Sequence, residues 1–184
     1  MTDPDQSGDP APDRDRAGEP VRDRDPGGRA RNARPRDELG RPLPRSAPGP
    51  QDVPRIPDDL AITPAEAAEL GGRLLAEGRP FHAHEVFEAA WKSAPDADRE
   101  FWRGLAQIAV GLTHARRGNA SGAVTLLRRG AAGVRGYAGD PPGIDPGFVA
   151  ASADDIANRI ERDGLAAVPA ASLLFPLRPG VSGG

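Results

Sequence analysis

The chain has 184 residues, carries 24 Lys and Arg against 27 Asp and Glu, and contains no cysteine. The absence of cysteine excludes disulfides and thiolate chemistry, and the balanced charge predicts no polyanionic partner. The length allows one domain of ordinary size with residues left over.

Residues 1–57 are predicted to form a disordered arm. They are rich in Pro and Gly and contain no aromatic residue, since Phe81 is the first in the chain. Such a composition buries too little apolar surface to offset backbone ordering, which costs about 1–2 kcal/mol per residue. Asp and Arg alternate, as in Asp13-Arg14-Asp15-Arg16, whereas an arm that binds nucleic acid carries a block of one sign. We therefore interpret the arm as a solubilising spacer and expect no nucleic-acid partner.

The chain shows no sign of a targeting or membrane segment. Its N-terminus has neither the basic region nor the apolar region of a signal peptide. The longest weakly polar run, from Gly104 to Ala115, is interrupted by Gln107 and His114, and it is shorter than the roughly 20 residues of a membrane span. These observations predict a cytoplasmic protein that does not enter a membrane.

The first predicted helix runs from Pro64 to about Glu77. Thr63 and Glu66 form a capping box, in which each side chain can bond the backbone amide of the other residue. Pro64 suits the first helical position, and Gly78 can end the helix in a left-handed conformation.

The second predicted helix runs from Phe81 to about Ser93, between Pro80 and Pro95. At 100° per residue, its buried face consists of four apolar residues: Ala83, Val86, Phe87 and Ala90. Three further side chains lie together at one edge of that face: His84, Glu88 and Trp91. Glu85 points in another direction.

The third predicted helix begins at Asp96 or Asp98, either of which can cap it, and ends near Arg117. Apolar residues recur at the 3-and-4 spacing of a core stripe: Phe101, Leu105, Ile108, Leu112 and Ala115. A second stripe lies beside it, with small and polar residues: Gly104, Gln107, Gly111 and His114. Small residues in that stripe predict the close approach of another helix.

The fourth predicted helix runs from Ala120 to about Gly136. Gly118 can end the third helix and Asn119 can cap the fourth, so the two helices are expected to be antiparallel neighbours. A fifth helix is predicted from Asp145-Pro146 to about Arg162, with Gly164 after its end.

The predicted fold class is all-α, a compact bundle of about five helices behind the disordered arm, because no strand pattern occurs. We place the helical domain at residues 58–164 and expect residues 165–184 to form a flexible C-terminal tail. Within the tail, Leu173-Leu174-Phe175 has the composition to dock on the bundle.

Two segments resemble a known family: FHAHEVFEAAW at 81–91 and WRGLAQIAVGLTHARRGNASGAVTLL at 102–127. In order and spacing they are similar to the bacterial family of domain of unknown function number 309, a compact helical bundle, over about residues 64–162. The resemblance implies that eight residues stand at signature positions: His84, Glu85, Glu88, Trp91, Gln107, His114, Asn119 and Gly122. It also implies a Glu at position 82 in many relatives, where this chain has His82. The family has no established activity to transfer.

The polar residues leave two interpretations open. In the preferred one, His84 and Glu88 pair with each other, and Gln107 and His114 pair across a helix interface, in a buried network that specifies packing. The chain is then a non-enzymatic interaction or structural module. A groove lined by Trp91, Gln107 and His114 would take a protein partner, and a homo-oligomer is an alternative. Asn119 serves only as a helix cap in this interpretation.

The alternative interpretation is a metal-dependent or acid–base enzyme. His84 and Glu88 stand four residues apart on one helix, so an imidazole and a carboxylate face the same side. His114 is the candidate for the third group, and a divalent metal is the cofactor that this set implies. The interpretation requires the three side chains to meet in one cleft.

Overall fold

The computed structural model describes residues 37, 40, 41, 43, 44 and 62–179. The rest of the predicted arm, and residues 180–184, lie outside the described residues. In the part that is described, no helix is long and apolar enough to cross a membrane.

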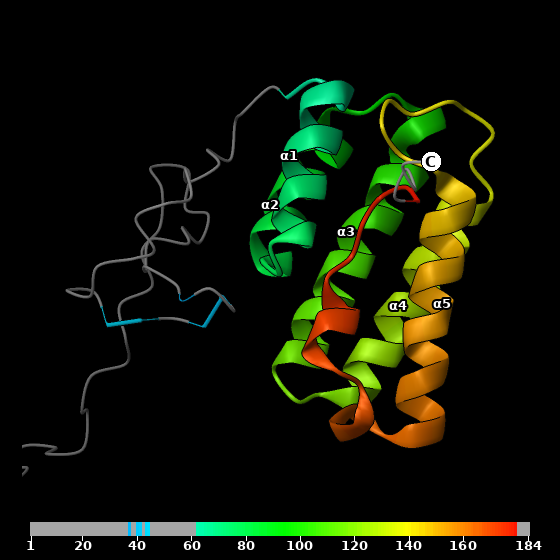
Figure 1. Ribbon diagram of the computed structural model, residues 1–184. Helices are drawn as coiled ribbons and strands as arrows, with labels where there is room; N and C mark the ends of the chain where they lie inside the picture. Colours follow the sequence, from blue (N-terminus) through cyan, green and yellow to red (C-terminus); the bar gives the residue numbers. More distant parts are fainter. Residues whose placement is uncertain (1–36, 38–39, 42, 45–61, 180–184) are drawn as a thin grey trace, which may run out of the picture. The chain divides into compact units, whose positions relative to one another are not determined.

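Five α-helices follow one another in the described chain (Figure 1): α1 (Pro64–Ala76), α2 (Pro80–Ser93), α3 (Asp96–Arg116), α4 (Ala120–Arg135) and α5 (Pro146–Asp163). Two short 3-10 turns come after them, η1 (Leu165–Ala167) and η2 (Ala170–Leu173). Residues 62–179 contain no strand. The predicted all-α bundle is confirmed.

Three of the predicted helix caps are present. The Glu66 amide donates to Thr63 Oγ1 at 3.3 Å, and the Thr63 amide donates to Glu66 Oε2 at 2.9 Å, which completes the capping box. Asn119 and Asp145 accept from the third amide of α4 and α5 at 3.0 and 2.9 Å. Short-range chemistry therefore sets these helix starts.

The predicted cap of α3 is wrong. Pro95 occupies the cap position, and it makes no side-chain hydrogen bond. Its φ of −57° and ψ of 155° leave the chain extended up to Asp96, which is already the first helical residue. Asp96 and Asp98 therefore lie in the first turn, where a carboxylate interacts favourably with the helix dipole.

Helix α3 is the centre of the bundle. Each helix contacts the next one along the chain, so α2 and α4 flank α3, while α1 covers α2 and α5 covers α4 (Figure 1). The predicted core stripe of α3 is buried along its whole length: Phe101, Leu105, Ile108, Leu112 and Ala115. The five-helix order follows directly from the short connections.

Helices α3 and α4 approach each other at glycines. A Cβ atom on Gly104 would lie 2.9 Å from the Gly130 carbonyl oxygen, and one on Gly130 would lie 2.6 Å from the Gly104 carbonyl oxygen. A Cβ on Gly111 would lie 3.0 Å from the backbone nitrogen of Leu127. The close approach predicted from the small-residue stripe is confirmed, and the approaching helix is α4.

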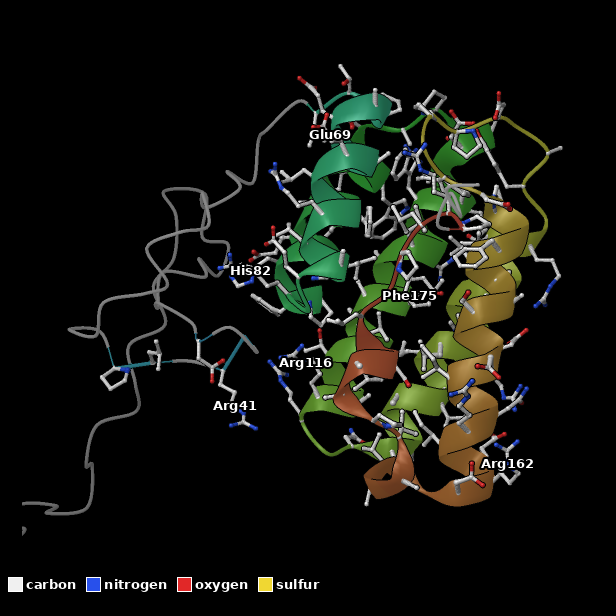
Figure 2. The ribbon with its side chains drawn as sticks, in the orientation of Figure 1. Arg41, Glu69, His82, Arg116, Arg162 and Phe175 are labelled. Carbon is white, nitrogen blue, oxygen red and sulfur yellow. The ribbon has the colours of Figure 1, made fainter. Side chains whose placement is uncertain are left out.

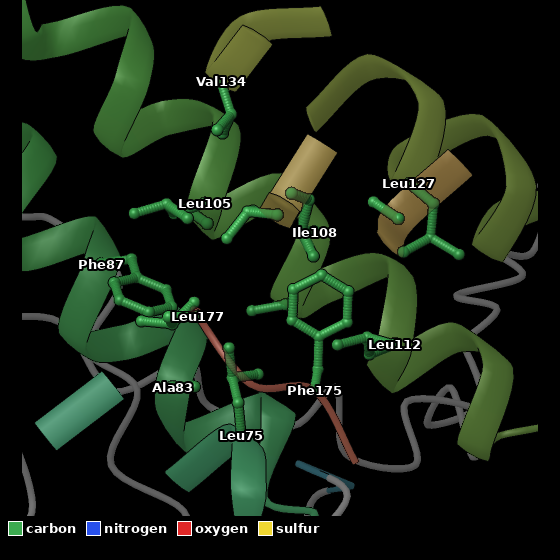
Figure 3. Packing of buried hydrophobic residues seen from close by; sticks show 14 of the residues in the cluster. Leu75, Ala83, Phe87, Leu105, Ile108, Leu112, Leu127, Val134, Phe175 and Leu177 are labelled. Carbon is green, nitrogen blue, oxygen red and sulfur yellow. The ribbon is translucent and has the colours of Figure 1, made fainter. Parts of the chain in front are cut away.

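Residues 173–177, which we call the C-terminal strap, complete the core. Leu173, Phe175 and Leu177 are buried, whereas Leu174 between them is 45% exposed. The strap runs over α3 (Figure 1), and Phe175 lies beside Ile108 and Leu112 (Figure 3). Figure 2 shows the Phe175 ring facing α3 from the strap. Burial alternates along the strap because an extended chain directs successive side chains to opposite sides.

The strap corrects the predicted domain boundary at residue 164. The Phe175 amide donates to the carbonyl of Leu75 in α1 at 3.3 Å, and the Leu177 carbonyl accepts from the amide of Asp145 at 2.8 Å. Two backbone hydrogen bonds and three buried side chains hold this segment. The packed domain therefore extends to at least Leu177, well inside the predicted flexible tail.

Candidate functional site

Three charged or polar side chains form a row on α2. His84 Nε2 lies 3.5 Å from Glu88 Oε2, and Lys92 Nζ lies 3.0 Å from Glu88 Oε1. The side chains of His84 and Glu88 are 27% and 34% exposed, and that of Lys92 is 53% exposed. The predicted pairing of His84 with Glu88 is confirmed, and Lys92 shares the same carboxylate.

The environment of His84 favours its neutral form. Burial lowers the pKa of His84 below its ordinary value; the Glu88 carboxylate opposes that shift, and Lys92 adds to it. Desolvation exceeds the attraction of the carboxylate because Glu88 is shared with a cation. The row on α2 therefore behaves as a partly buried surface network.

His114 lies at the corner between α3 and α4, in contact with the cap of α4. Asn119 Nδ2 lies 2.8 Å from His114 Nδ1. Asn119 Oδ1 accepts from the Gly122 amide at 3.0 Å and from the Ser121 hydroxyl at 3.3 Å. Because the oxygen is used in the cap, the amide nitrogen must be the donor toward His114. His114 Nδ1 is therefore the acceptor, and the ring carries its hydrogen on Nε2.

Gly122 provides the space for this corner. A Cβ atom at position 122 would lie 2.8 Å from His114 Nδ1 and 2.7 Å from Asn119 Nδ2. Gly118, at φ of 82°, turns the chain between the two helices. His114, Asn119 and Gly122 therefore form one structural joint. The prediction that Asn119 caps α4 is confirmed; its bond to His114 was missed, although the Gly118-Asn119 turn was a signal for it.

The predicted three-ligand metal site is not formed. Across the described ranges, no group of three or more His, Asp or Glu side chains is placed to hold a metal ion. His114 is engaged by Asn119 through Nδ1, and it does not join His84 and Glu88. A zinc site needs at least three protein ligands, so this part of the enzyme interpretation is corrected.

The predicted pairing of Gln107 and His114 across a helix interface is not found among the described residues. Gln107 is half-buried, and its Oε1 atom is buried without a hydrogen-bond partner among the residues that are described. His114 bonds Asn119 instead, because the α3–α4 turn brings the cap residue to it. The expected single network is therefore two local pairs, one on α2 and one at the α3–α4 corner.

The remaining predicted residues lie on α2. Trp91 is half-buried and packs against the hydrophobic core, and Glu85 is half-buried. His82 is buried, and its ring meets Phe81 edge-on with 5.5 Å between centroids. Position 82 is therefore part of an aromatic contact in this chain.

An open groove of about 450 Å³, which was not predicted from the sequence, lies between α3 and α4. We call it the α3–α4 groove. It is lined by Ala97, Glu100, Phe101, Arg129, Ala132, Gly133, Gly136 and Tyr137. None of the predicted site residues lines it. The signal was the pair of glycines on α4 followed by the single tyrosine of the chain, but only the fold places Tyr137 against α3.

Two stacked aromatic rings lie in the wall of this groove. The centroids of Phe101 and Tyr137 are 4.3 Å apart, and the rings are nearly parallel. The Tyr137 hydroxyl donates to Asp98 Oδ1 at 2.8 Å. Burial raises the pKa of Tyr137, and the hydrogen bond to Asp98 raises it further. The tyrosine therefore stays protonated, and its ring is fixed at both ends.

The rim of the groove carries one compensated and one uncompensated charge. Glu100 pairs with Arg103 at 3.0 Å, whereas Arg129 is exposed and makes no ion pair with the residues that the structure describes. Arg128, the neighbour of Arg129, bonds Asn158 at 2.9 Å and also bonds Glu161. Arg129 is therefore available to an acidic group from outside.

Comparisons with known proteins support the family resemblance. Residues 69–126 match the model of the family described as Domain of unknown function (DUF309), and the predicted resemblance is confirmed over these residues. The Uncharacterized protein YpuF of Bacillus subtilis (strain 168) is 44% identical over 48 residues, which is 26% of this chain and 28% of YpuF. The match thus spans less than a third of that relative. No solved structure is significantly similar to the chain.

Proposed function

We propose that this chain is a non-enzymatic interaction module that binds a peptide segment of another protein in the α3–α4 groove. The observation that carries the proposal is the stacked pair of Phe101 and Tyr137 in the wall of an open groove, beside Arg129, which is exposed and forms no ion pair within the described part of the chain. A cytoplasmic location belongs to the same proposal.

The polar residues at the family's signature positions have structural uses. Glu88 lies between His84 and Lys92, and His114 accepts a hydrogen bond from the residue that caps α4. Acid–base chemistry needs groups that converge on one reacting atom. These residues instead occupy two separate places, which favours a module that binds over one that catalyses.

The groove is shaped to receive a side chain. Tyr137 is fixed by its stacking on Phe101 and by its bond to Asp98, so the aromatic wall loses little entropy when a partner binds. A Cβ atom on Gly136 would meet nothing within 4 Å. The glycine therefore leaves an opening through which an apolar side chain of a partner can reach the half-buried ring of Tyr137, behind which Phe101 is buried.

The rest of the surface points to a peptide rather than to a broad oligomer interface. Among the residues that are described, Leu174 is the one large hydrophobic side chain that is exposed. Stable oligomers use wide apolar patches, and a single leucine does not make one. An apolar side chain for the rings and a carboxylate for Arg129 together define the expected partner segment.

The proposal is tested by selecting peptides from a random phage-displayed library on the full chain. We expect enriched peptides to combine an aromatic or aliphatic residue with an Asp or Glu at a fixed spacing. Affinities of the selected peptides are then measured by fluorescence polarisation. Gly136→Leu should fill the opening, and Arg129→Glu should repel the acidic group. Each change should weaken binding by at least about tenfold, equal to about 1.4 kcal/mol.

Gly147→Leu is the matched control for this experiment. Gly147 is exposed in the first turn of α5, outside the groove, and a Cβ there meets only Asp145 Oδ1, at 3.4 Å. The control should bind the selected peptides as the wild type does. Peptides that bind Gly136→Leu with unchanged affinity, or a selection without a shared pattern, would contradict the proposal.

A further inference from the structure

A compact turn precedes the bundle in the described chain. The Arg41 amide donates to Asp37 Oδ1 at 2.7 Å, the Gly40 amide donates to the Asp37 carbonyl at 2.8 Å, and the Asp37 amide donates to the Arg41 carbonyl at 3.0 Å. We call Asp37, Gly40 and Arg41 the arm turn. Gly40 has a φ of 73°, a conformation that other residues rarely adopt. Three hydrogen bonds therefore close a turn that requires glycine.

Gly40 packs against an aromatic ring of α2. Gly40 is buried, and a Cβ atom on it would lie 2.2, 2.4 and 2.5 Å from three carbons of the Phe81 ring. Such distances leave no room for any side chain at position 40. The Gly40 backbone is thus packed closely against the Phe81 ring, and glycine is needed there for space as well as for φ.

Phe81 has no place in the core of the bundle. It belongs neither to the buried hydrophobic cluster nor to the partly buried hydrophobic residues that pack against that cluster. Its ring instead neighbours His82 at 5.5 Å and His84 at 6.4 Å between centroids. A phenylalanine outside the core contributes more to folding when another segment packs against it, and Gly40 packs against Phe81.

We propose that the arm turn is an intramolecular docking motif and that Phe81, at the start of α2, is its receptor. The docked segment belongs to the predicted arm, so this part of residues 1–57 has a specific binding role instead of serving only as a spacer. The contact fixes one point of the arm on the domain, four residues before Glu85. It is separate from the α3–α4 groove, because none of its residues lines that groove.

The test compares valine substitutions at two glycines of the full chain. Gly40 and Gly143 both have φ of 73°, but a Cβ on Gly143 meets nothing within 4 Å. Gly40→Val and Gly143→Val therefore both place valine at a left-handed φ, and only Gly40→Val collides with Phe81. Phe81→Ala removes the receptor from the other side. Amide hydrogen exchange at Gly40 and Arg41 is measured by NMR in all four proteins.

We expect Gly40→Val and Phe81→Ala to accelerate hydrogen exchange of the Arg41 amide by about tenfold or more. A tenfold acceleration corresponds to a loss of about 1.4 kcal/mol of local stability. Gly143→Val should leave it unchanged. In the wild type, the ring current of Phe81 should shift the α-protons of Gly40 upfield, and Phe81→Ala should remove that shift. The Gly136→Leu groove variant should affect neither signal, which separates this inference from the proposed function.

Two outcomes would overturn the inference. The first is exchange at Arg41 that is as fast in the wild type as in Gly40→Val, with no upfield shift at Gly40. The second is protection that increases with protein concentration, because the arm turn would then dock on a second copy of the chain. Gly40 lies outside the helices, so Gly40→Val remains informative even if Phe81→Ala unfolds part of α2.

Discussion

Helix α4 contacts its two neighbours in different ways. Against α3, the backbones meet at Gly104 and Gly130, where even one methyl group would collide with a carbonyl oxygen. Against α5, a buried apolar stripe is flanked by ion pairs from flexible arginines, with Arg128 bonding Glu161 and Arg135 bonding Asp154. The first contact has no freedom to adjust, because backbone atoms are involved. The second can rearrange by side-chain rotation alone, so substitutions should separate the two.

The largest effect is expected at the α3–α4 contact. A Cβ on Gly130 would lie 2.6 Å from the Gly104 carbonyl oxygen and 2.9 Å from the Ile108 amide nitrogen. Gly130→Val should therefore force the helices apart and lower the free energy of unfolding by about 3 kcal/mol or more. Thermal and chemical unfolding measure it, with Gly136→Val as the control at the open C-cap position of α4. A loss under about 1 kcal/mol would show that α3 and α4 can adjust after all.

The next effect is expected at the corner where α3 passes into α4. Asn119→Ala removes the helix cap and the donor to His114 together, at about 1 kcal/mol each. Asn119→Ser keeps a capping oxygen and loses only the contact with His114, so it should cost about half as much. Urea unfolding of both variants gives the comparison. Equal losses would mean that the bond to His114 contributes nothing beyond the cap.

The ion pairs between α4 and α5 should matter less. The side chains of Arg135 and Arg128 are 56% and 43% exposed, and pairs at such positions contribute about 0.2–1 kcal/mol each. Arg135→Ala and Arg128→Ala should therefore lower stability by no more than this, and the loss should shrink at high salt. Arg129→Ala, beside them on α4, is the unpaired control. If Arg135→Ala lowered the free energy of unfolding as much as Gly130→Val, the α3 and α5 faces of α4 would not differ in the way described.

The smallest effect should be a pH dependence from His84 on α2. Burial lowers its pKa in the folded state from the ordinary 6.5, so between the two values the unfolded chain binds more protons than the folded chain. The stability that His84 contributes is therefore fully present above about pH 6.5, and it is lost as the pH falls toward the folded-state pKa of His84. His84→Gln should reduce this slope, measured by thermal unfolding from pH 7.5 to 5. Glu88→Gln should steepen it, because the carboxylate that supports the charged imidazole is lost.

Local chemistry explains which parts of the fold were predictable. The starts of α1, α4 and α5 follow from Thr63, Asn119 and Asp145, each of which bonds an amide three residues away. The close α3–α4 contact follows from small residues at helical spacing. The cap of α3 was predicted wrongly because an acidic residue near a helix start, such as Asp96, is favourable both as a cap and within the first turn.

Contacts between distant residues explain what the sequence did not reveal. Phe101 and Tyr137 stack across 36 positions of the chain, so the groove exists only once α3 and α4 are packed. The burial of Phe175 depends on contacts with residues far away in the chain, Leu75 in α1 and Ile108 and Leu112 in α3. The expected cluster of His84, Glu88 and His114 failed for the same reason: the spacing of His84 and Glu88 along α2 is local, whereas the position of His114 depends on how α3 packs, and there it contacts Asn119.

The C-terminal strap also has a consequence for the order in which the chain is made. Phe175 and Leu177 are synthesised after all five α-helices. The helices therefore first assemble while the apolar surface of α3 beneath the strap is still uncovered. A chain that ends before residue 173 contains all five α-helices but lacks the strap, so this apolar surface remains exposed. Exposed apolar surface of this kind is what chaperones and proteases recognise. Burial of the strap therefore covers this apolar surface only in chains that extend past Leu177.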